Sequence, residues 1–252
     1  MIKKIILPII TYVCSISLSA QNVSSELNCP ESDTIYQKDY KSGPYFYEPF
    51  PLIPGNSIFQ IGGSFTLLPI TVVENEYPIP ALDLQYKYGL IKNISLIGSL
   101  STNYFSNLLH AGLQWNTNYS NFSIGLASHL GGFVGFITSE GQFEDNSAYA
   151  IFLMPILRFG LRTEEFSASM SFVAAYILRS VNKVSDLKAP GPTNTWNDFY
   201  CTIAIEQPMF KKTLFSFGLS LAFARTPYQS WLLYNTIDQY QFVPEFFFAI
   251  QL

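Results

Sequence analysis

After Asn56 the chain alternates apolar and polar residues in one segment after another. Successive side chains of a β-strand point to opposite faces, so each segment predicts a strand with one apolar and one polar face. The alternation is clearest where Phe215 and Phe217 alternate with Ser216 and Gly218. The segments, each about 9–14 residues long as expected for strands that cross a membrane, are 57–67, 81–90, 93–102, 107–115, 121–130, 149–161, 165–178, 196–207, 214–224 and 239–252.

The polar faces of these segments carry mainly Ser, Gly, Ala, Thr and Gln. Charged residues make up 13% of the chain, whereas a typical soluble domain has about 25%. A soluble β-sandwich would have a charged outer face, but a membrane barrel turns its apolar face to lipid and its polar face to the lumen. The pattern therefore favours an all-β fold, a transmembrane antiparallel up-and-down β-barrel, with a soluble sandwich as the alternative.

The links between the segments alternate in length. Links after even-numbered segments are brief, and links after odd-numbered segments are long except at 103–106. Because outer-membrane barrels have short periplasmic turns and long extracellular loops, this predicts about ten strands with both termini in the periplasm. Eight or twelve strands are the alternatives, since 67–73 and 131–137 can be read as strand extensions. No apolar run after the N-terminus approaches the roughly 18–20 residues of a membrane-spanning helix, which excludes a polytopic helical protein.

Residues 1–20 have the organisation of a secretory signal peptide. Two lysines precede an apolar stretch at 5–16, and small residues lead up to Ala20. We expect cleavage after Ala20, or after Ser19, and hence export from the cytoplasm.

Residues 21–56, before the predicted barrel at 57–252, are rich in Pro, Tyr, Ser and Asp and show no period. They are either a loose periplasmic leader or a plug that folds into the lumen. The formal net charge is −4 and no basic patch is present, so we expect no nucleic-acid partner. Cys14 lies in the signal peptide, and Cys29 and Cys201 lie far apart, so we expect no disulfide.

Three short stretches carry a resemblance to a family. They are LSAQ at 18–21, YKYGL with NISLIGSL within 86–100, and FFFAIQL at 246–252. The chain resembles small outer-membrane β-barrel proteins of the porin-like or transporter type found in the Bacteroidota. The resemblance implies an outer-membrane location in a Gram-negative envelope, surrounding lipid, and recognition of the C-terminal strand by the outer-membrane insertion machinery. It names no substrate.

The histidines are the sharpest chemical feature of the predicted lumen. If the turn at 116–120 centres near residues 119–120, His110 lies directly opposite His129. A tight hairpin at 103–106 places Ser99 opposite His110, and Asp83 then lies opposite Ser99 or Ser101. The row has three interpretations. It is a polar lining, a transition-metal or solute-selectivity site at His110 and His129, or a hydrolase site with Ser99 as nucleophile and His110 as base.

Further charged side chains point inward by the same periodicity, namely Arg158, Lys87, Asp198, Glu206 and Glu245. Their mixed signs indicate salt bridges that brace the wall. Ten strands leave little room inside a barrel, although small residues at Ser95, Gly112, Gly125, Ser169, Gly218 and Ser220 vacate some of it. We therefore expect an integral outer-membrane barrel for restricted passage of a small solute or ion. The alternatives are an assembly component that binds another envelope protein and, least favoured, a membrane-embedded hydrolase that uses Ser99 and His110.

Overall fold

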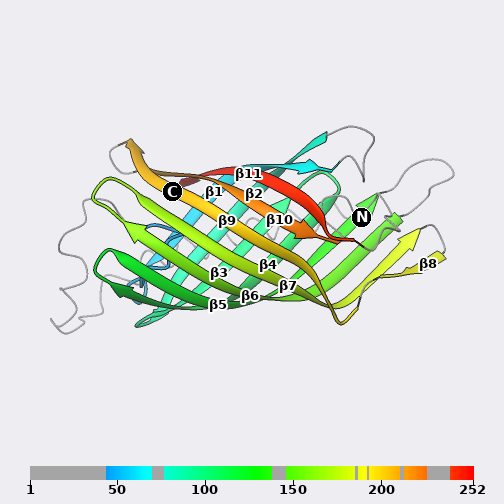
Figure 1. Cartoon of the computed structure of the whole chain (residues 1–252), viewed down its shortest axis with the longest axis horizontal. Coiled ribbons are helices and arrows are strands. Elements are labelled where there is room, and N and C mark those ends of the chain that lie inside the picture. Colours follow the sequence, from blue (N-terminus) through cyan, green and yellow to red (C-terminus); the bar gives the residue numbers. More distant parts are fainter. Residues whose placement is uncertain are drawn as a thin grey trace. The chain divides into compact units, whose positions relative to one another are not determined.

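The computed structural model describes residues 44–69, 77–137, 146–184, 187–191, 193–210, 213–225 and 239–252. Residues 41–252 form one compact unit. In the described part of this unit, strands run obliquely around a closed barrel (Figure 1). The strands are β1 (Ser57–Leu68), β2 (Tyr77–Ile91), β3 (Ile94–Thr102), β4 (Ser106–Tyr119), β5 (Phe122–Ile137), β6 (Asn146–Arg162), β7 (Ser167–Val184), β8 (Leu187–Pro190), β9 (Thr195–Phe210), β10 (Thr213–Ala224) and β11 (Gln241–Gln251).

Ten of these strands form the barrel wall, and every pairing is antiparallel. Each wall strand pairs with its neighbours in the chain, and β9 pairs with β7 across the short strand β8. The barrel closes where β1 pairs with β11, from Gln60 opposite Gln251 to Thr66 opposite Glu245. β8 pairs with β7 alone and extends that hairpin. The predicted ten-stranded, all-β barrel is therefore confirmed.

Several strands are longer than their sequence segments. β5 continues to Ile137, so residues 131–137 extend an existing strand and do not add another. Among the residues that the structure describes, no helix is long and apolar enough to cross a membrane.

Brief links gather at one end of the barrel, called the turn end here. They connect β2 to β3, β4 to β5, β6 to β7, and β9 to β10. Two of these turns place a residue other than glycine in the left-handed region, Asn93 with φ 66° and Ser120 with φ 53°. The opposite end, called the loop end, carries the longer links, and the link at 103–105 is the short exception.

The outer face of the barrel is apolar. Large side chains such as Leu109, Leu113, Leu126 and Leu130 each expose about half of their surface, as expected for the predicted outward positions. The inner face is less polar than the lumen expected from the sequence. An apolar cluster lines it on β6 and β7, formed by Phe152, Met154, Ile156, Ala175 and Ile177.

Candidate functional site in the barrel lumen

Residues 44–56, called the inner segment here, lie inside the barrel (blue in Figure 1). Tyr45 exposes 1% of its surface and Glu48 exposes 0%. The sequence left open whether residues 21–56 form a loose leader or a plug. In the described part of that stretch, Tyr45, Phe46, Glu48, Pro49 and Leu52 are buried, while Pro44 and residues 54–56 are exposed. Residues 21–43 and the predicted signal peptide at 1–20 lie outside the described residues.

A carboxylate of the wall binds the backbone of the inner segment. Glu206 on β9 accepts hydrogen bonds from the amides of Phe46 at 2.8 Å, Tyr47 at 2.8 Å and Glu48 at 3.1 Å. Successive backbone N–H groups that converge in this way form a concave anion site. Ser216 also donates to Glu206, at 3.2 Å. The wall therefore holds the inner segment through charge-assisted hydrogen bonds to three consecutive residues.

Two cations of the wall bind the same stretch from other strands. Arg162 on β6 forms an ion pair with Glu48 at 2.5 Å, and its Nε donates to the same oxygen at 2.7 Å. Its guanidinium also stacks over the rings of Tyr45 and Phe50. Lys87 on β2 donates to the carbonyls of Phe46 at 3.3 Å and Glu48 at 3.0 Å. Buried charges thus link three strands to the inner segment.

Glycines of the wall leave the space that the inner segment occupies. A Cβ atom at Gly125 would lie 2.6 Å from Pro49 Cβ, and one at Gly160 would lie 2.7 Å from Glu48 Cγ. Gly89 lies so close to the Ile53 carbonyl oxygen that any Cβ would collide with it. Gly125, one of the small residues expected to vacate space in the lumen, is therefore a contact site for the inner segment.

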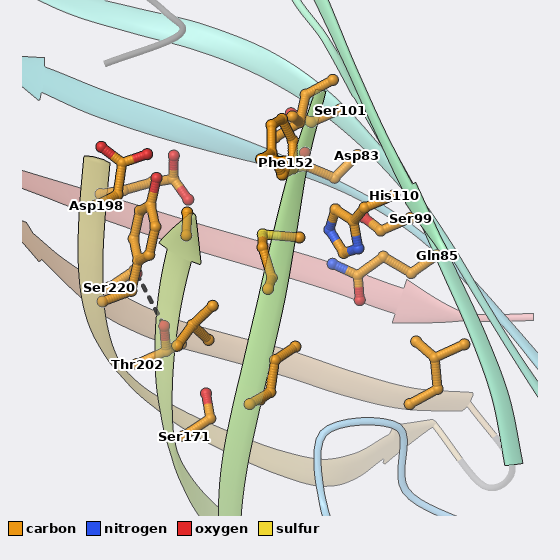
Figure 2. A pocket seen from close by; sticks show the side chains of 18 of the residues that line it. Asp83, Gln85, Ser99, Ser101, His110, Phe152, Ser171, Asp198, Thr202 and Ser220 are labelled. Atoms are coloured by element: carbon orange, nitrogen blue, oxygen red, sulfur yellow. Dashed lines mark hydrogen bonds between the residues drawn. The ribbon is translucent and has the colours of Figure 1, made fainter. Parts of the chain in front are cut away.

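Beyond the inner segment, toward the loop end, lies a cavity of about 230 Å³ (Figure 2). Phe46, Tyr47 and Phe247 line it where it meets the inner segment. Tyr47 accepts a hydrogen bond from Gln85 at 2.8 Å and packs on Phe247, with ring centroids 5.1 Å apart. Of the predicted site residues, Asp83, Ser99, His110 and Arg158 line this cavity, while Glu206 binds the inner segment below it.

The two histidines meet, although not in the expected register. His110 lies opposite Gly131, and His129 lies opposite Gly112, so the histidines are diagonal neighbours and not directly opposed. The predicted register was wrong by two residues because the turn centres between Ser120 and Asn121. Each histidine faces a glycine on the neighbouring strand, and the two imidazole rings stack with centroids 5.1 Å apart.

The Nδ1 atoms of His110 and His129 are 3.1 Å apart, so one ring carries the proton and the other accepts it. A catalytic zinc site normally has three protein ligands and a structural site has four. Within the described ranges, no group of three His, Cys, Asp or Glu residues could hold a metal ion. The pair therefore offers two nitrogen ligands, already joined by a hydrogen bond.

The two residues of the hydrolase hypothesis, Ser99 and His110, are neighbours but lack the hydrogen bonds that would activate a nucleophile. Ser99 lies opposite His110, and Asp83 lies opposite Ser101, in line with the sequence analysis. Figure 2 shows Ser99 and His110 on the same side of the cavity. A nucleophile needs a hydrogen-bonded base that a third group orients, but His110 directs Nδ1 to His129. In the described part of the chain, no hydrogen bond joins Ser99 to His110.

Sequence reasoning did not single out Glu48 and Arg162. Arg162 was assigned to a link between strands, whereas it is the last residue of β6 and faces the lumen. Glu48 lies in a stretch without periodicity, so no pattern predicts where its side chain points. The ion pair between Arg162 and Glu48 joins the wall to the inner segment.

No protein-family model and no curated protein matches the sequence. Among solved structures, the chain is similar to the translocator domain of the autotransporter NalP from Neisseria meningitidis. The identity is 8% and the TM-score 0.39, over 77% of this chain and 87% of that one. A mutant Rh. blastica porin is similar at 4% identity and a TM-score of 0.20, over 78% of this chain and 99% of that one. Neither TM-score carries a functional conclusion. The molecule's own geometry defines its class, a closed ten-stranded β-barrel with a segment of its own chain in the lumen.

Proposed function

We propose that this protein is an integral outer-membrane β-barrel that restricts the passage of a small solute, with the inner segment closing the turn end of its lumen. The observation that carries the proposal is the binding of residues 46–48 by Glu206, Lys87 and Arg162. The apolar outer face supports membrane insertion, since exposed Leu, Phe and Ile side chains cover the wall strands.

Closure by the inner segment fits the size of the barrel. Interiors of eight strands are filled by side chains, and aqueous channels belong to barrels of about 16–18 strands. A ten-stranded barrel lies near the small end of this range, so a short peptide segment is enough to block it. The cavity on the loop-end side of the inner segment is then a vestibule that a solute reaches before any passage.

Planar-bilayer conductance of the refolded mature protein tests the proposal. We expect small or rare current steps from residues 21–252 and larger or more frequent steps from residues 57–252, which lack the inner segment. The heat-modifiable gel shift of a folded barrel is the control for both proteins. The proposal fails if both proteins show that shift and neither conducts, or if removal of residues 21–56 leaves the current unchanged.

A further inference from the structure

The cavity above the inner segment has two chemically different walls. On β4 to β7 its lining is largely apolar, with Leu108, Phe133, Phe152, Met154, Ile156 and Val173. Around the remaining arc, from β9 through β11 to β2 and β3, the lining is polar and contains three carboxylates, those of Asp83, Asp198 and Glu245. Small-molecule sites combine an apolar lining with a few placed polar groups in this way.

The carboxylates are oriented by neutral donors. Asn197 donates to Asp198 at 2.7 Å, and Thr66 donates to Glu245 at 2.7 Å. These donors fix the orientation of the Asp198 and Glu245 carboxyl groups. Asp198 exposes 9% of its surface, so its carboxyl group is largely shielded from solvent.

Cations are scarce in the lining. Arg158 is the guanidinium among the lining residues, whereas Lys87 and Arg162 bind the inner segment. Among the described residues, no Lys or Arg forms an ion pair with Asp83 or Asp198. Figure 2 shows these two carboxylates on opposite sides of the cavity, with Phe152 on the wall between them. The side-chain oxygens of both groups can accept hydrogen bonds from a ligand ammonium.

We propose that this cavity binds a small organic cation, with an ammonium group toward Asp83 or Asp198 and an apolar body against Phe152 and its neighbours. A volume of about 230 Å³ lies below the roughly 300–1,000 Å³ of pockets for drug-sized ligands, so the ligand is small. The inference deepens the proposed function. It rests on that function in one respect, namely that the solute enters this cavity before passage.

Three probes with one apolar body and different polar ends test the charge preference: 2-phenylethylammonium, 2-phenylethanol and phenylacetate. Binding is measured by calorimetry to the mature protein in nanodiscs of zwitterionic lipid, with empty nanodiscs subtracted to remove membrane partitioning. We expect the ammonium probe to bind about tenfold more tightly than the alcohol, because hydrogen bonds to charged groups are the stronger ones. Phenylacetate should bind weakest.

Substitutions then locate the site. Either Asp198→Asn or Asp83→Asn, according to which group holds the ammonium, should weaken ammonium binding several-fold and leave the alcohol unchanged, whereas Phe152→Ala should weaken both probes. Glu165→Gln, at an exposed position in the turn before β7, is the matched control and should change nothing. The heat-modifiable gel shift verifies that each variant folds. If Asp198→Asn does not fold, binding to the Asp83→Asn variant still tests the inference.

Three results would overturn the inference: no binding of any probe, tightest binding of phenylacetate, or ammonium binding that survives both aspartate substitutions together. Because binding is measured at equilibrium, its outcome is separate from conductance. A barrel that binds the ammonium probe but never conducts contradicts passage alone, and one that conducts without preferring the cation contradicts this inference alone.

Discussion

Gly125 on β5 shows how a single side chain would govern the fit of the inner segment. Because its Cβ would lie 2.6 Å from Pro49 Cβ, Gly125→Val forces two further methyl groups into occupied space. Overpacking of this kind costs about 1–3 kcal/mol. Since the barrel wall is held by strand pairing on both sides, we expect the inner segment to move instead.

Amide hydrogen exchange of residues 46–48 measures that movement. A penalty of about 1–3 kcal/mol corresponds to roughly 5-fold to 150-fold faster exchange through local opening. Gly98→Val is the matched control, because the nearest atom to its Cβ position is the His110 carbonyl oxygen at 3.9 Å. Equal exchange rates in the two variants would show that Gly125 does not shape the contact with Pro49.

At the scale of the strand, alternation predicted which face each wall residue occupies. Phe215 and Phe217 lie outside and Ser216 inside, because the period of two is a property of every strand and needs no tertiary information. Alternation alone does not predict the register between neighbouring strands. The pairing of β4 with β5 depends on which two residues form the turn, and an error there displaced the expected partner of His110 by two positions.

The inner segment was beyond the reach of the same reasoning. Its hydrogen bonds join Phe46 to Glu206, which are separated by 160 positions in the chain. Such contacts follow from barrel closure and from the shape of the lumen, neither of which a local pattern contains. Residues 44–56 have no alternation of their own, so the sequence could supply the alternatives of leader or plug but no preference based on periodicity.

The outward face of β5 provides a prediction about membrane insertion. Leu126 exposes 52% of its surface and lies a few residues from the turn at 120–121, within the depth expected for hydrocarbon. Leu126→Arg should lower the free energy of unfolding in lipid vesicles by about 2–4 kcal/mol, because a cation near the bilayer midplane is costly. Tyr119→Arg, at the turn end with 86% exposure, should cost about 0–1 kcal/mol.

Guanidinium unfolding titrations in vesicles of short-chain phosphatidylcholine measure both values. An exposed Leu on a water-soluble protein tolerates Arg with little change in stability. Equal stabilities of the two variants would therefore contradict insertion of this face in a bilayer. The comparison separates the membrane barrel from the soluble alternative without reference to any transported solute.

For the whole molecule, the buried charges and the inner segment should behave as one thermodynamic unit. With the inner segment in place, the Glu206 carboxylate accepts hydrogen bonds from three backbone amides. A glutamine side chain would place an NH₂ group among those donors. Glu206→Gln should therefore lower the free energy of unfolding of residues 21–252 by about 2–3 kcal/mol, within the range of about 1.5–3 kcal/mol for hydrogen bonds to a charged group.

The same substitution in residues 57–252 completes a double-mutant cycle. Without the inner segment, the Glu206 side chain faces water together with Gln60 and Ser216, and the change in stability should stay within about 0.5 kcal/mol. The coupling free energy is then at least about 1.5 kcal/mol, measured by guanidinium unfolding followed through tryptophan fluorescence. Glu165→Gln should be neutral in both backgrounds. If Glu206→Gln costs the same with and without residues 21–56, then Glu206 stabilises the wall and not the closure of the lumen.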